Sequence, residues 1–325
     1  MRSAIFQSFG EPAEVLAPGD APVPEPGAGE VRVRMRLAPI HNHDLVAIRG
    51  RYGWKPQLPA IGGSEGFGVV DALGEGVRDI ALGQRVNAAS GQGTWAEYFV
   101  VPARMLVPLP DAIDDQTAAQ LVAMPLSALM LLESLDVQPG QWIVQNAANG
   151  AVGTTLAMLA AARGVRVLSL VRRDDGVERL RAAGVEPALA TDGEGWRQAA
   201  RALLGEAGAR AAVDSVGGQA SGELAALLGE GGTLVSFGAM SGEPMVIPSG
   251  DVIFRQLTVR GFWGSQASRA MPAARRRELV AELVQRAATG SLRLPVDAVY
   301  GLDQVAQAAA ASLRPGRGGK VLLRG

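Results

Sequence analysis

Cysteine is absent from this 325-residue chain, and histidine occurs only twice, as His41 and His43. The absence of cysteine excludes disulfides, thiolate nucleophiles and every zinc site built on cysteine. Two histidines cannot form a three-histidine catalytic zinc site, which leaves only a two-histidine site completed by a carboxylate such as Asp44. The sequence therefore favours chemistry that does not depend on a metal ion.

An excess of positive charge and a long apolar run are also missing. Lys and Arg together number 31 against 32 for Asp and Glu, so the chain lacks the basic surplus that neutralises nucleic-acid phosphates. The longest apolar stretch, residues 118–132, contains Gln120 and Ser127 and is shorter than the roughly 18 residues that cross a bilayer. The first residues lack the apolar stretch of a signal peptide. We therefore expect a cytoplasmic protein that acts on small molecules and binds neither nucleic acid nor membranes.

The distribution of short strands and long helices predicts two domains. Up to about residue 110, β-type segments alternate with Gly and Pro, which is typical of a mainly β, barrel-like domain. From there to about residue 289, apolar strands alternate with amphipathic helices, beginning with one helical pattern over 115–135, and this alternation indicates a parallel sheet. We predict a first domain at 1–115, completed by 290–325, and a dinucleotide-binding domain at 116–289.

The strongest local motif lies where a predicted strand, 142–148, passes into a predicted helix, Ala151–Arg163. Its small residues Ala148, Gly150 and Gly153 have the spacing of the GxGxxG/A fingerprint. Small side chains there let the backbone approach a pyrophosphate, whose charge is stabilised by the free amides at the helix start. A tight turn without a ligand is the alternative, and the surrounding strand-helix-strand unit favours the nucleotide site.

The strand after this helix ends in Val171, Arg172 and Arg173. Domains that bind NAD usually place an acid near this point, where it accepts a hydrogen bond from the ribose 2′-hydroxyl. A guanidinium instead matches the 2′-phosphate of NADP(H) by bidentate hydrogen bonding. The two arginines therefore predict NADPH, with two solvated surface arginines as the alternative.

Seven segments, taken in order, resemble the zinc-free medium-chain dehydrogenases/reductases, and most closely the mitochondrial-type 2-enoyl thioester reductases. They are PIHNHDLVAIRGRYG, LPAIGGSEG, GTWAEY, NAANGAVG, DSVGG, VSFGAM and RGFWGSQ. The resemblance covers nearly the whole chain. It implies a GroES-like, mainly β catalytic domain joined to a Rossmann domain with a doubly wound parallel sheet. It also implies a homodimer that binds NADPH.

The resemblance assigns cofactor contacts residue by residue. Those around the diphosphate and the 2′-phosphate are implied to be Asn149, Gly150, Ala151, Val152, Gly153, Arg172, Arg173 and Asp174. Those along the cofactor and beside its nicotinamide are implied to be Phe237, Gly238, Ala239, Met240, Phe262, Trp263, Gly264 and Ser265, with Lys320 as a late contact.

The enoyl reductases that the chain resembles carry a catalytic Tyr in a Gly-x-Tyr-Gly context, which residues 50–53 match. The resemblance therefore implies that Tyr52 is catalytic, against the alternative of a Tyr packed on a loop. Zinc-dependent relatives have a Cys and a His where this chain has His41 and Ser64, so no metal ligand set is expected. The chain also departs from the enoyl reductases, which usually have Asn-Pro before the Asp that corresponds to Asp44. His41 is either a proton donor, a substrate contact or a structural residue.

We expect hydride transfer from NADPH to an electron-poor conjugated acceptor, most simply the C=C bond of a 2-enoyl thioester. Tyr52 would donate a hydrogen bond to the carbonyl oxygen, where negative charge builds. A quinone or enone oxidoreductase of the same superfamily uses the same cofactor site. A third interpretation is an NADPH-binding sensor or structural protein without turnover. The sequence does not distinguish the acceptors.

Overall fold

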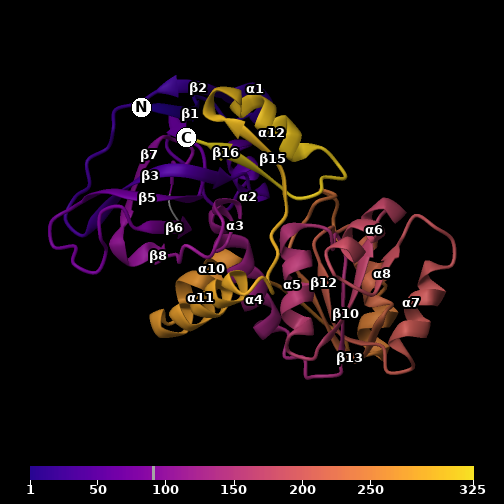
Figure 1. Ribbon diagram of the computed structural model, residues 1–325. Helices are drawn as coiled ribbons and strands as arrows, with labels where there is room; N and C mark the ends of the chain where they lie inside the picture. The colour runs from indigo at the N-terminus through magenta and orange to yellow at the C-terminus, as the bar shows by residue number, and fades with distance from the viewer. Residues whose placement is uncertain (90–91) are drawn as a thin grey trace. The chain divides into compact units, whose positions relative to one another are not determined.

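A computed structural model describes residues 1–89 and 92–325 of the chain (Figure 1). The chain divides into two compact units, which we call unit 1 and unit 2. Unit 1 comprises Met1–Met124 and Val280–Gly325, and unit 2 comprises Pro125–Leu279. Within the described residues, no helix is both long and apolar enough to cross a membrane.

Unit 1 is mainly β, as predicted, and its larger sheet has seven strands among the described residues. Neighbouring strands are antiparallel except for the parallel pair β15 and β16. In sheet order the strands are β15 (Val296–Gly301), β16 (Lys320–Arg324), β3 (Glu30–Pro39), β5 (Glu65–Leu73), β6 (Arg85–Ala89) and β8 (Leu106–Pro108), with β7 (Tyr98–Pro102) also paired to β3.

A three-stranded sheet and several short helices complete unit 1. The small sheet has the order β2 (Leu16–Asp20), β1 (Arg2–Phe6) and β4 (Ala60–Ile61). The helices are α1 (Pro12–Val15), α2 (Asn42–Ile48), η1 (Ala103–Met105), α3 (Asp115–Ala119), η2 (Leu302–Gln304) and α12 (Val305–Leu313).

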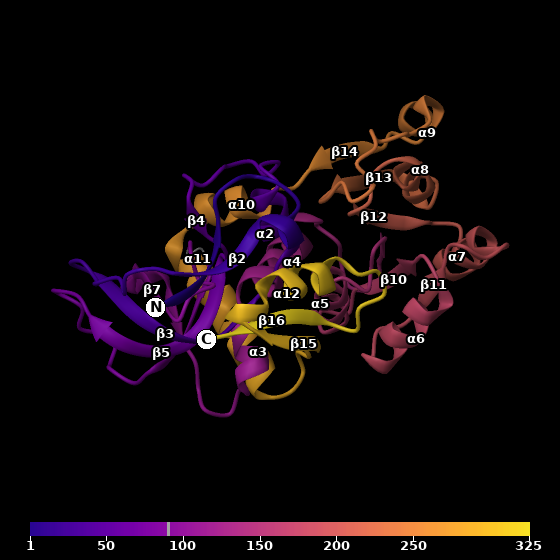
Figure 2. The same ribbon diagram turned by 90° about the horizontal axis from the view of Figure 1, so that it is seen from above.

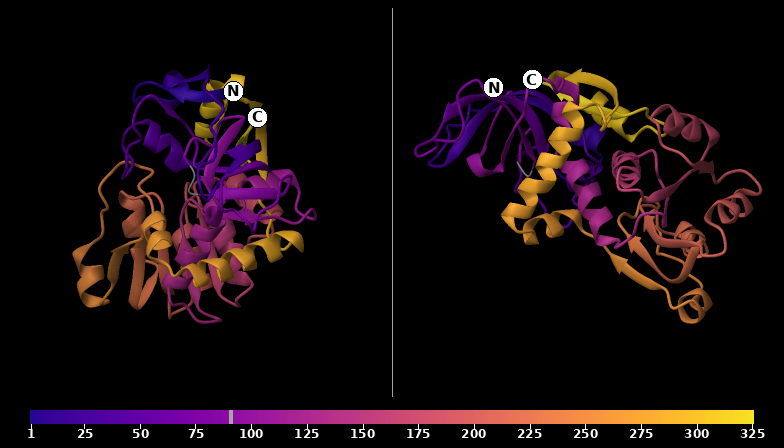
Figure 3. Two further views of the ribbon diagram at one scale, coloured as in Figure 1. Left: turned by 90° about the vertical axis from the view of Figure 1, so that its left-hand side faces the viewer. Right: turned by 60° about the horizontal axis from the view of Figure 1, so that its bottom comes forward.

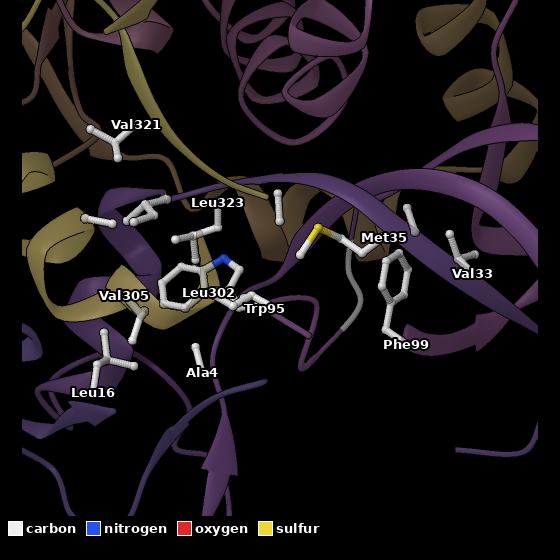
Figure 4. Close-up of a cluster of buried hydrophobic side chains, with 14 of the residues drawn as sticks. Ala4, Leu16, Val33, Met35, Trp95, Phe99, Leu302, Val305, Val321 and Leu323 are labelled. Carbon is white, nitrogen blue, oxygen red and sulfur yellow. The ribbon is translucent and has the colours of Figure 1, made fainter. Parts of the chain in front are cut away.

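The core of unit 1 follows from the alternation of side chains along β3. Val31, Val33 and Met35 are buried, whereas the arginines between them are half-buried or exposed, as expected for a strand with one face on the core. Met35 lies in a cluster with Trp95 and Phe99, and residues of η2, α12 and β16 join the same cluster (Figure 4). The C-terminal segment is therefore part of the core of unit 1.

Unit 2 contains a six-stranded sheet in which every neighbouring pair is parallel. If these strands are numbered along the chain, their order is 3-2-1-4-5-6, which is the order of a Rossmann domain and confirms the prediction. In sheet order the strands are β11 (Ala188–Ala190), β10 (Arg166–Val171), β9 (Trp142–Gln145), β12 (Ala209–Asp214), β13 (Leu228–Ser236) and β14 (Thr258–Gly261). Figure 2 labels β12, β13 and β14 in succession.

Helices alternate with the strands of unit 2. They are α5 (Ala151–Ala161), α6 (Asp174–Ala182), α7 (Trp196–Leu204), α8 (Gln219–Ala225), α9 (Ser249–Phe254) and α10 (Gly264–Ala270). All four residues of β9 are buried, as in a strand whose sheet is covered on both faces. Helix α11 (Ala273–Ala288), the long orange helix in both views of Figure 3, contains one boundary between the units.

The prediction of one helical segment over 115–135 was wrong, because this stretch forms two helices, α3 and α4 (Ala123–Ser134). The break has a local cause. The backbone N–H groups of Val122 and Ala123 donate to the carboxylate of Glu65, at 2.9 and 3.0 Å, instead of to carbonyls of the preceding turn. Pro125, which lacks an N–H, follows in the first turn of α4.

Candidate active site

Polar side chains from two segments of unit 1 meet at one place. His41, His43 and Asp44 belong to the N-terminal end of α2, which directly follows β3. Ser64 and Glu65 belong to the start of β5, which pairs with β3. The carboxylate of Asp44 accepts a hydrogen bond from the backbone N–H of His41 at 2.9 Å and so caps the helix. We call these five residues the polar cluster.

Two glycines position Ser64 and Glu65. A Cβ added to Gly62 or Gly63 would overlap the indole of Trp95, and Gly63 has a φ of +93°, which side-chain-bearing residues rarely adopt. The indole N–H of Trp95 donates to the carbonyl of Pro39 at 3.1 Å. The Gly-Gly pair therefore lets the chain pass closely over a buried tryptophan just before the polar cluster.

His41 and Glu65 form a hydrogen bond of 2.7 Å between Nε2 and Oε2, and both side chains are fully buried. The other oxygen of Glu65 accepts from the side chain of Asn87 at 3.1 Å and from the two amides described above. Burial raises the pKa of Glu65 to about 7, against the lowering effect of these donors. Burial also lowers the pKa of His41 well below its usual value, and Lys320 adds to that effect.

These two shifts favour a neutral pair. Below about pH 7, a protonated Glu65 donates its O–H to the lone pair on Nε2 of a neutral His41. The remaining proton of the ring then lies on Nδ1, which is buried without a hydrogen-bond partner in the part of the chain that the structure describes. His41 is therefore held in one tautomer by Glu65.

A second chain of hydrogen bonds runs through His43, Ser64 and Asp44. The Ser64 hydroxyl lies 2.6 Å from Oδ1 of Asp44 and 2.7 Å from Nε2 of His43. The Ser64 hydroxyl donates its single proton to Asp44, so its oxygen accepts from Nε2–H of His43. Asp44 is nearly buried, whereas the His43 side chain is 25% exposed.

The structure brings Tyr52 to this cluster. Tyr52 lies in the loop after α2, and its ring centroid is 5.8 Å from that of His43. Gly50, with a φ of +69°, allows the chain to turn back between the helix and Tyr52. The rings of His43 and His41 are stacked at 5.1 Å. The catalytic role of Tyr52 stays a prediction.

Lys320, at the start of β16, also lies beside the cluster. Its ammonium donates to the carbonyl of Ile40, the residue before His41, at 3.3 Å. Burial and, to a smaller extent, Arg317 lower the pKa of Lys320 to about 8, although Asp44 and Glu65 oppose the change. In unit 1 this lysine therefore contributes positive charge near the two carboxyl groups, and its predicted contact with a cofactor stays a prediction.

The polar cluster does not have the arrangement of a metal site. Across residues 1–89 and 92–325, no group of three or more His, Asp or Glu side chains is arranged to hold a metal ion. The side chains of the cluster instead form hydrogen bonds with one another.

In unit 2, the predicted diphosphate loop forms the turn between β9 and α5. Gly150 is the N-cap of α5, and Asn149 precedes it. A Cβ added to Gly153 would lie 2.7 Å from the carbonyl oxygen of Ala148, so only glycine allows this close approach of helix and strand. Strand β9 lies between β10 and β12, where the strand order of the sheet reverses, and ligands of such sheets bind at this point.

The predicted 2′-phosphate residues lie at the neighbouring strand end. Arg172 and Arg173 follow β10, and Asp174 begins α6; all three are exposed. Arg173 lies 3.7 Å from Asp175, too far for a strong ion pair between exposed groups. Arg173, Asp174 and Asp175 line a surface hollow together with Ala190, Asp192 and Gly193.

The remaining predicted cofactor segments lie at the ends of adjacent strands. Residues 237–240 follow β13, and residues 262–265 follow β14 and begin α10. The rings of Phe237 and Phe262 are 6.1 Å apart, and residues of both segments line one hollow in unit 2. The structure therefore brings these two segments together, and their contact with a cofactor stays a prediction.

Asp214 was not identified from the sequence as a residue that organises these loops. It is fully buried at the end of β12 and accepts from the side chain of Asn146 at 2.7 Å and from the hydroxyl of Ser221 at 2.5 Å. It also accepts from the amides of Val216 and Gly217. The sequence signal that could have identified Asp214 was its place as the first residue of the DSVGG motif.

Comparison with known proteins identifies the family. Residues 27–111 match the model of the alcohol dehydrogenase GroES-like domain, and residues 151–283 match that of the zinc-binding dehydrogenases. The chain is 34% identical to the mitochondrial enoyl-[acyl-carrier-protein] reductase of Homo sapiens over 322 residues, which are 97% of this chain and 86% of that one. The chain belongs to the medium-chain dehydrogenase/reductase superfamily.

Solved structures of similar proteins agree with this assignment. A putative NADPH:quinone reductase from Bacillus thuringiensis is 31% identical, with a TM-score of 0.91 over 100% of this chain and 98% of that one. A mycobacterial protein solved in complex with NADPH is 28% identical, with a TM-score of 0.89 over 100% of both chains. Unit 1 is thus the GroES-like domain of the superfamily, and unit 2 is its Rossmann domain.

The resemblance described above places the zinc ligands of zinc-dependent relatives at two positions where this chain has other residues. The chain has His41 and Ser64 there, and both are engaged in hydrogen bonds to carboxyl groups. The sequence predicted that zinc ligands are replaced at these two positions, but not that the replacing side chains form hydrogen bonds with Glu65 and Asp44. Residues about 20 positions apart meet only because β5 pairs with β3 and α2 follows β3.

Proposed function

We propose that this chain is an NADPH-dependent reductase that transfers hydride to an electron-poor conjugated acceptor, namely the C=C bond of a 2-enoyl thioester. The observation that supports this most is the position of Tyr52 beside the polar cluster, in a chain that resembles enoyl reductases over 97% of its length. The cluster offers hydrogen-bond donors and titratable groups without a metal, which suits an acceptor that needs only charge stabilisation at its carbonyl.

Unit 2 has features that fit NADPH. Gly153 removes the Cβ that would keep α5 away from the strand, so the free amides at the start of α5 are open to a diphosphate. Arg172 and Arg173 are exposed at the end of β10, where a 2′-phosphate would lie. When bound, NADPH supplies the hydride.

The protein's own contribution to the reaction is charge stabilisation. As the β carbon of the acceptor gains hydride, negative charge moves to the carbonyl oxygen. The hydroxyl of Tyr52 donates a hydrogen bond to that oxygen, and this bond strengthens as the charge builds.

A quinone reductase is the second candidate. It is favoured by the likeness to the putative NADPH:quinone reductase from Bacillus thuringiensis. A quinone accepts hydride with less help from an acid, so the same cofactor site would serve with a smaller role for Tyr52.

One set of assays distinguishes these functions. NADPH oxidation is followed on crotonyl-CoA, longer 2-enoyl-CoAs, an enone and a quinone, with NADH as the control cofactor. Turnover of the thioesters with the highest kcat/KM supports the proposal. Turnover of the quinone alone supports the second candidate, and binding of NADPH without any turnover would indicate a sensor or structural protein.

The homodimer and the cytoplasmic location are further parts of this proposal. Strand β14 is the edge of the sheet of unit 2, and an unpaired edge can add a strand of a second copy. Near this edge Ile253 and Phe254 are 57% and 82% exposed, and Val259 of β14 is also exposed. Burial of these apolar side chains against a second copy would stabilise a dimer. The location stays a prediction.

A further inference from the structure

The polar cluster contains a histidine that the proposed mechanism does not use. The hydrogen bonds of His43 occupy one ring nitrogen only, because Nε2 is bound to Ser64. Its other nitrogen, Nδ1, has no hydrogen-bond partner among the described residues. It is also not one of the buried atoms that lack a partner, so it is accessible to solvent. The ring is partly exposed and lies next to Tyr52.

We propose that His43 is the acid that protonates the α carbon of the substrate, while Tyr52 stabilises the carbonyl oxygen. The chain from Asp44 through Ser64 fixes the neutral ring as the Nε2–H tautomer, so Nδ1 is the atom that gains and loses a proton. This inference rests on the proposed function, because it assigns the second of two hydrogens that the reduction of a C=C bond requires.

Hydride addition at the β carbon leaves an enolate, whose electron pair forms the new bond from the α carbon to the proton of His43. The Nδ1–H bond breaks, its electron pair stays on nitrogen, and the imidazolium becomes a neutral imidazole. Water then protonates Nδ1 again, which the 25% exposure of the side chain allows.

The neighbouring His41 does not fit this role. It is fully buried, its Nε2 is bound to Glu65, and burial lowers its pKa well below the usual value. The two rings are stacked at 5.1 Å but are held by different carboxyl groups through different hydrogen bonds. His41 is therefore a neutral structural partner of Glu65, and His43 is the histidine that exchanges protons.

The tautomer of His43 gives a test that needs no cofactor or substrate. Because the chain has only two histidines, a long-range proton–nitrogen NMR spectrum of the imidazoles shows only two rings. In mildly alkaline buffer Glu65 is ionised and accepts from Nε2–H of His41, so we expect both rings as the Nε2–H tautomer, with the His43 ring assigned by its loss in the His43→Gln variant. In Ser64→Ala, the His43 ring should lose its preference for Nε2–H. A His43 ring with its proton on Nδ1 would overturn the proposal.

The catalytic test uses the full chain with NADPH and crotonyl-CoA in deuterated water. The wild type should place deuterium on one face of the α carbon. In His43→Gln, whose side-chain amide can still donate to Ser64, kcat should fall by about 10²–10⁴-fold with an unchanged KM for NADPH. The deuterium should then appear on both faces, because water delivers it.

The control is Asn42→Gln, at an exposed position of the same helix end, which should behave as wild type. Single-face labelling with an unchanged kcat in His43→Gln would contradict the role of His43. If the wild type reduces a quinone but no enoyl thioester, the proposed function fails instead, and the tautomer measurement still tests the hydrogen-bond chain.

Discussion

At the scale of single residues, Tyr52 is the side chain on which the choice of acceptor depends. Tyr52→Phe removes only the hydroxyl. If that group stabilises the developing enolate, kcat for a 2-enoyl thioester should fall about ten- to a thousandfold, while the affinity for NADPH is unchanged. A quinone should lose much less, because it needs little acid assistance. The measurement is steady-state kinetics on both acceptors.

Tyr98→Phe is the matched control for Tyr52. Tyr98 lies in β7, where its ring packs against the guanidinium of Arg32 at 5.7 Å, so loss of its hydroxyl should leave kcat unchanged on every acceptor. A folded Tyr52→Phe protein with wild-type kcat on all acceptors would return Tyr52 to a structural role.

The raised pKa of Glu65 predicts how the free energy of unfolding depends on pH. Its pKa is raised from 4.5 to about 7 in the folded protein, so between these values the folded state binds more of this proton than the unfolded chain. Its contribution to the free energy of unfolding is therefore fully present below about pH 4.5 and lost as pH rises through about 7. His41, whose pKa is lowered from 6.5, contributes the opposite slope as pH falls below 6.5.

The two slopes oppose each other in the wild type, and Glu65→Gln removes the contribution of Glu65, because glutamine keeps an acceptor for Asn87 but does not titrate. Relative to this variant, the wild type should gain on the order of 3 kcal/mol in free energy of unfolding as pH falls from about 7 to about 4.5. Urea unfolding of both proteins across this range measures the difference. Parallel curves would show that Glu65 is already ionised at low pH in the folded protein.

At the scale of elements, the turn after β10 should determine cofactor preference. Replacing Arg172 and Arg173 together by Ala removes the guanidinium groups that can bind a 2′-phosphate. Each charge-assisted contact contributes roughly 1.5–3 kcal/mol, so NADPH should bind at least about tenfold more weakly. NADH, which lacks this phosphate, should be little affected.

Fluorescence titration with both cofactors measures these affinities. Arg181→Ala, an exposed arginine near the other end of α6, is the matched control and should leave both unchanged. Equal weakening of NADPH and NADH in the double variant would show that the two arginines do not bind the phosphate.

Elements with a strong local pattern could be predicted from the sequence. The strand-helix-strand unit around NAANGAVG was found because small residues and apolar runs are local signals. β11 was not found, because three half-buried residues carry almost no pattern. The break between α3 and α4 was missed since its cause, Glu65, is 57 residues away from Val122 in the sequence. The hydrogen-bond chain of His43 was missed for the same reason.

At the scale of the whole molecule, the metal content is the simplest property to measure. We expect the purified protein to hold no stoichiometric zinc and to keep its activity in the presence of a chelator, because Ser64 and His41 form hydrogen bonds with the carboxyl groups of Asp44 and Glu65. Elemental analysis decides the point. One tightly bound zinc per chain, with activity lost on its removal, would contradict the prediction.

The position of β16 has a consequence for how the protein is made. Its residues Lys320–Arg324 pair with β3, and unit 2 lies between these two strands in the sequence. The ribosome synthesises the chain from the N-terminus, so the Rossmann domain is complete before β16 is made. The sheet of unit 1 therefore lacks β16 while unit 2 can already fold. The edge of β3 that pairs with β16 stays unpaired until the end of synthesis, and Lys320 reaches Ile40 only after β16 has been added. The contact of Lys320 beside the polar cluster is therefore made last.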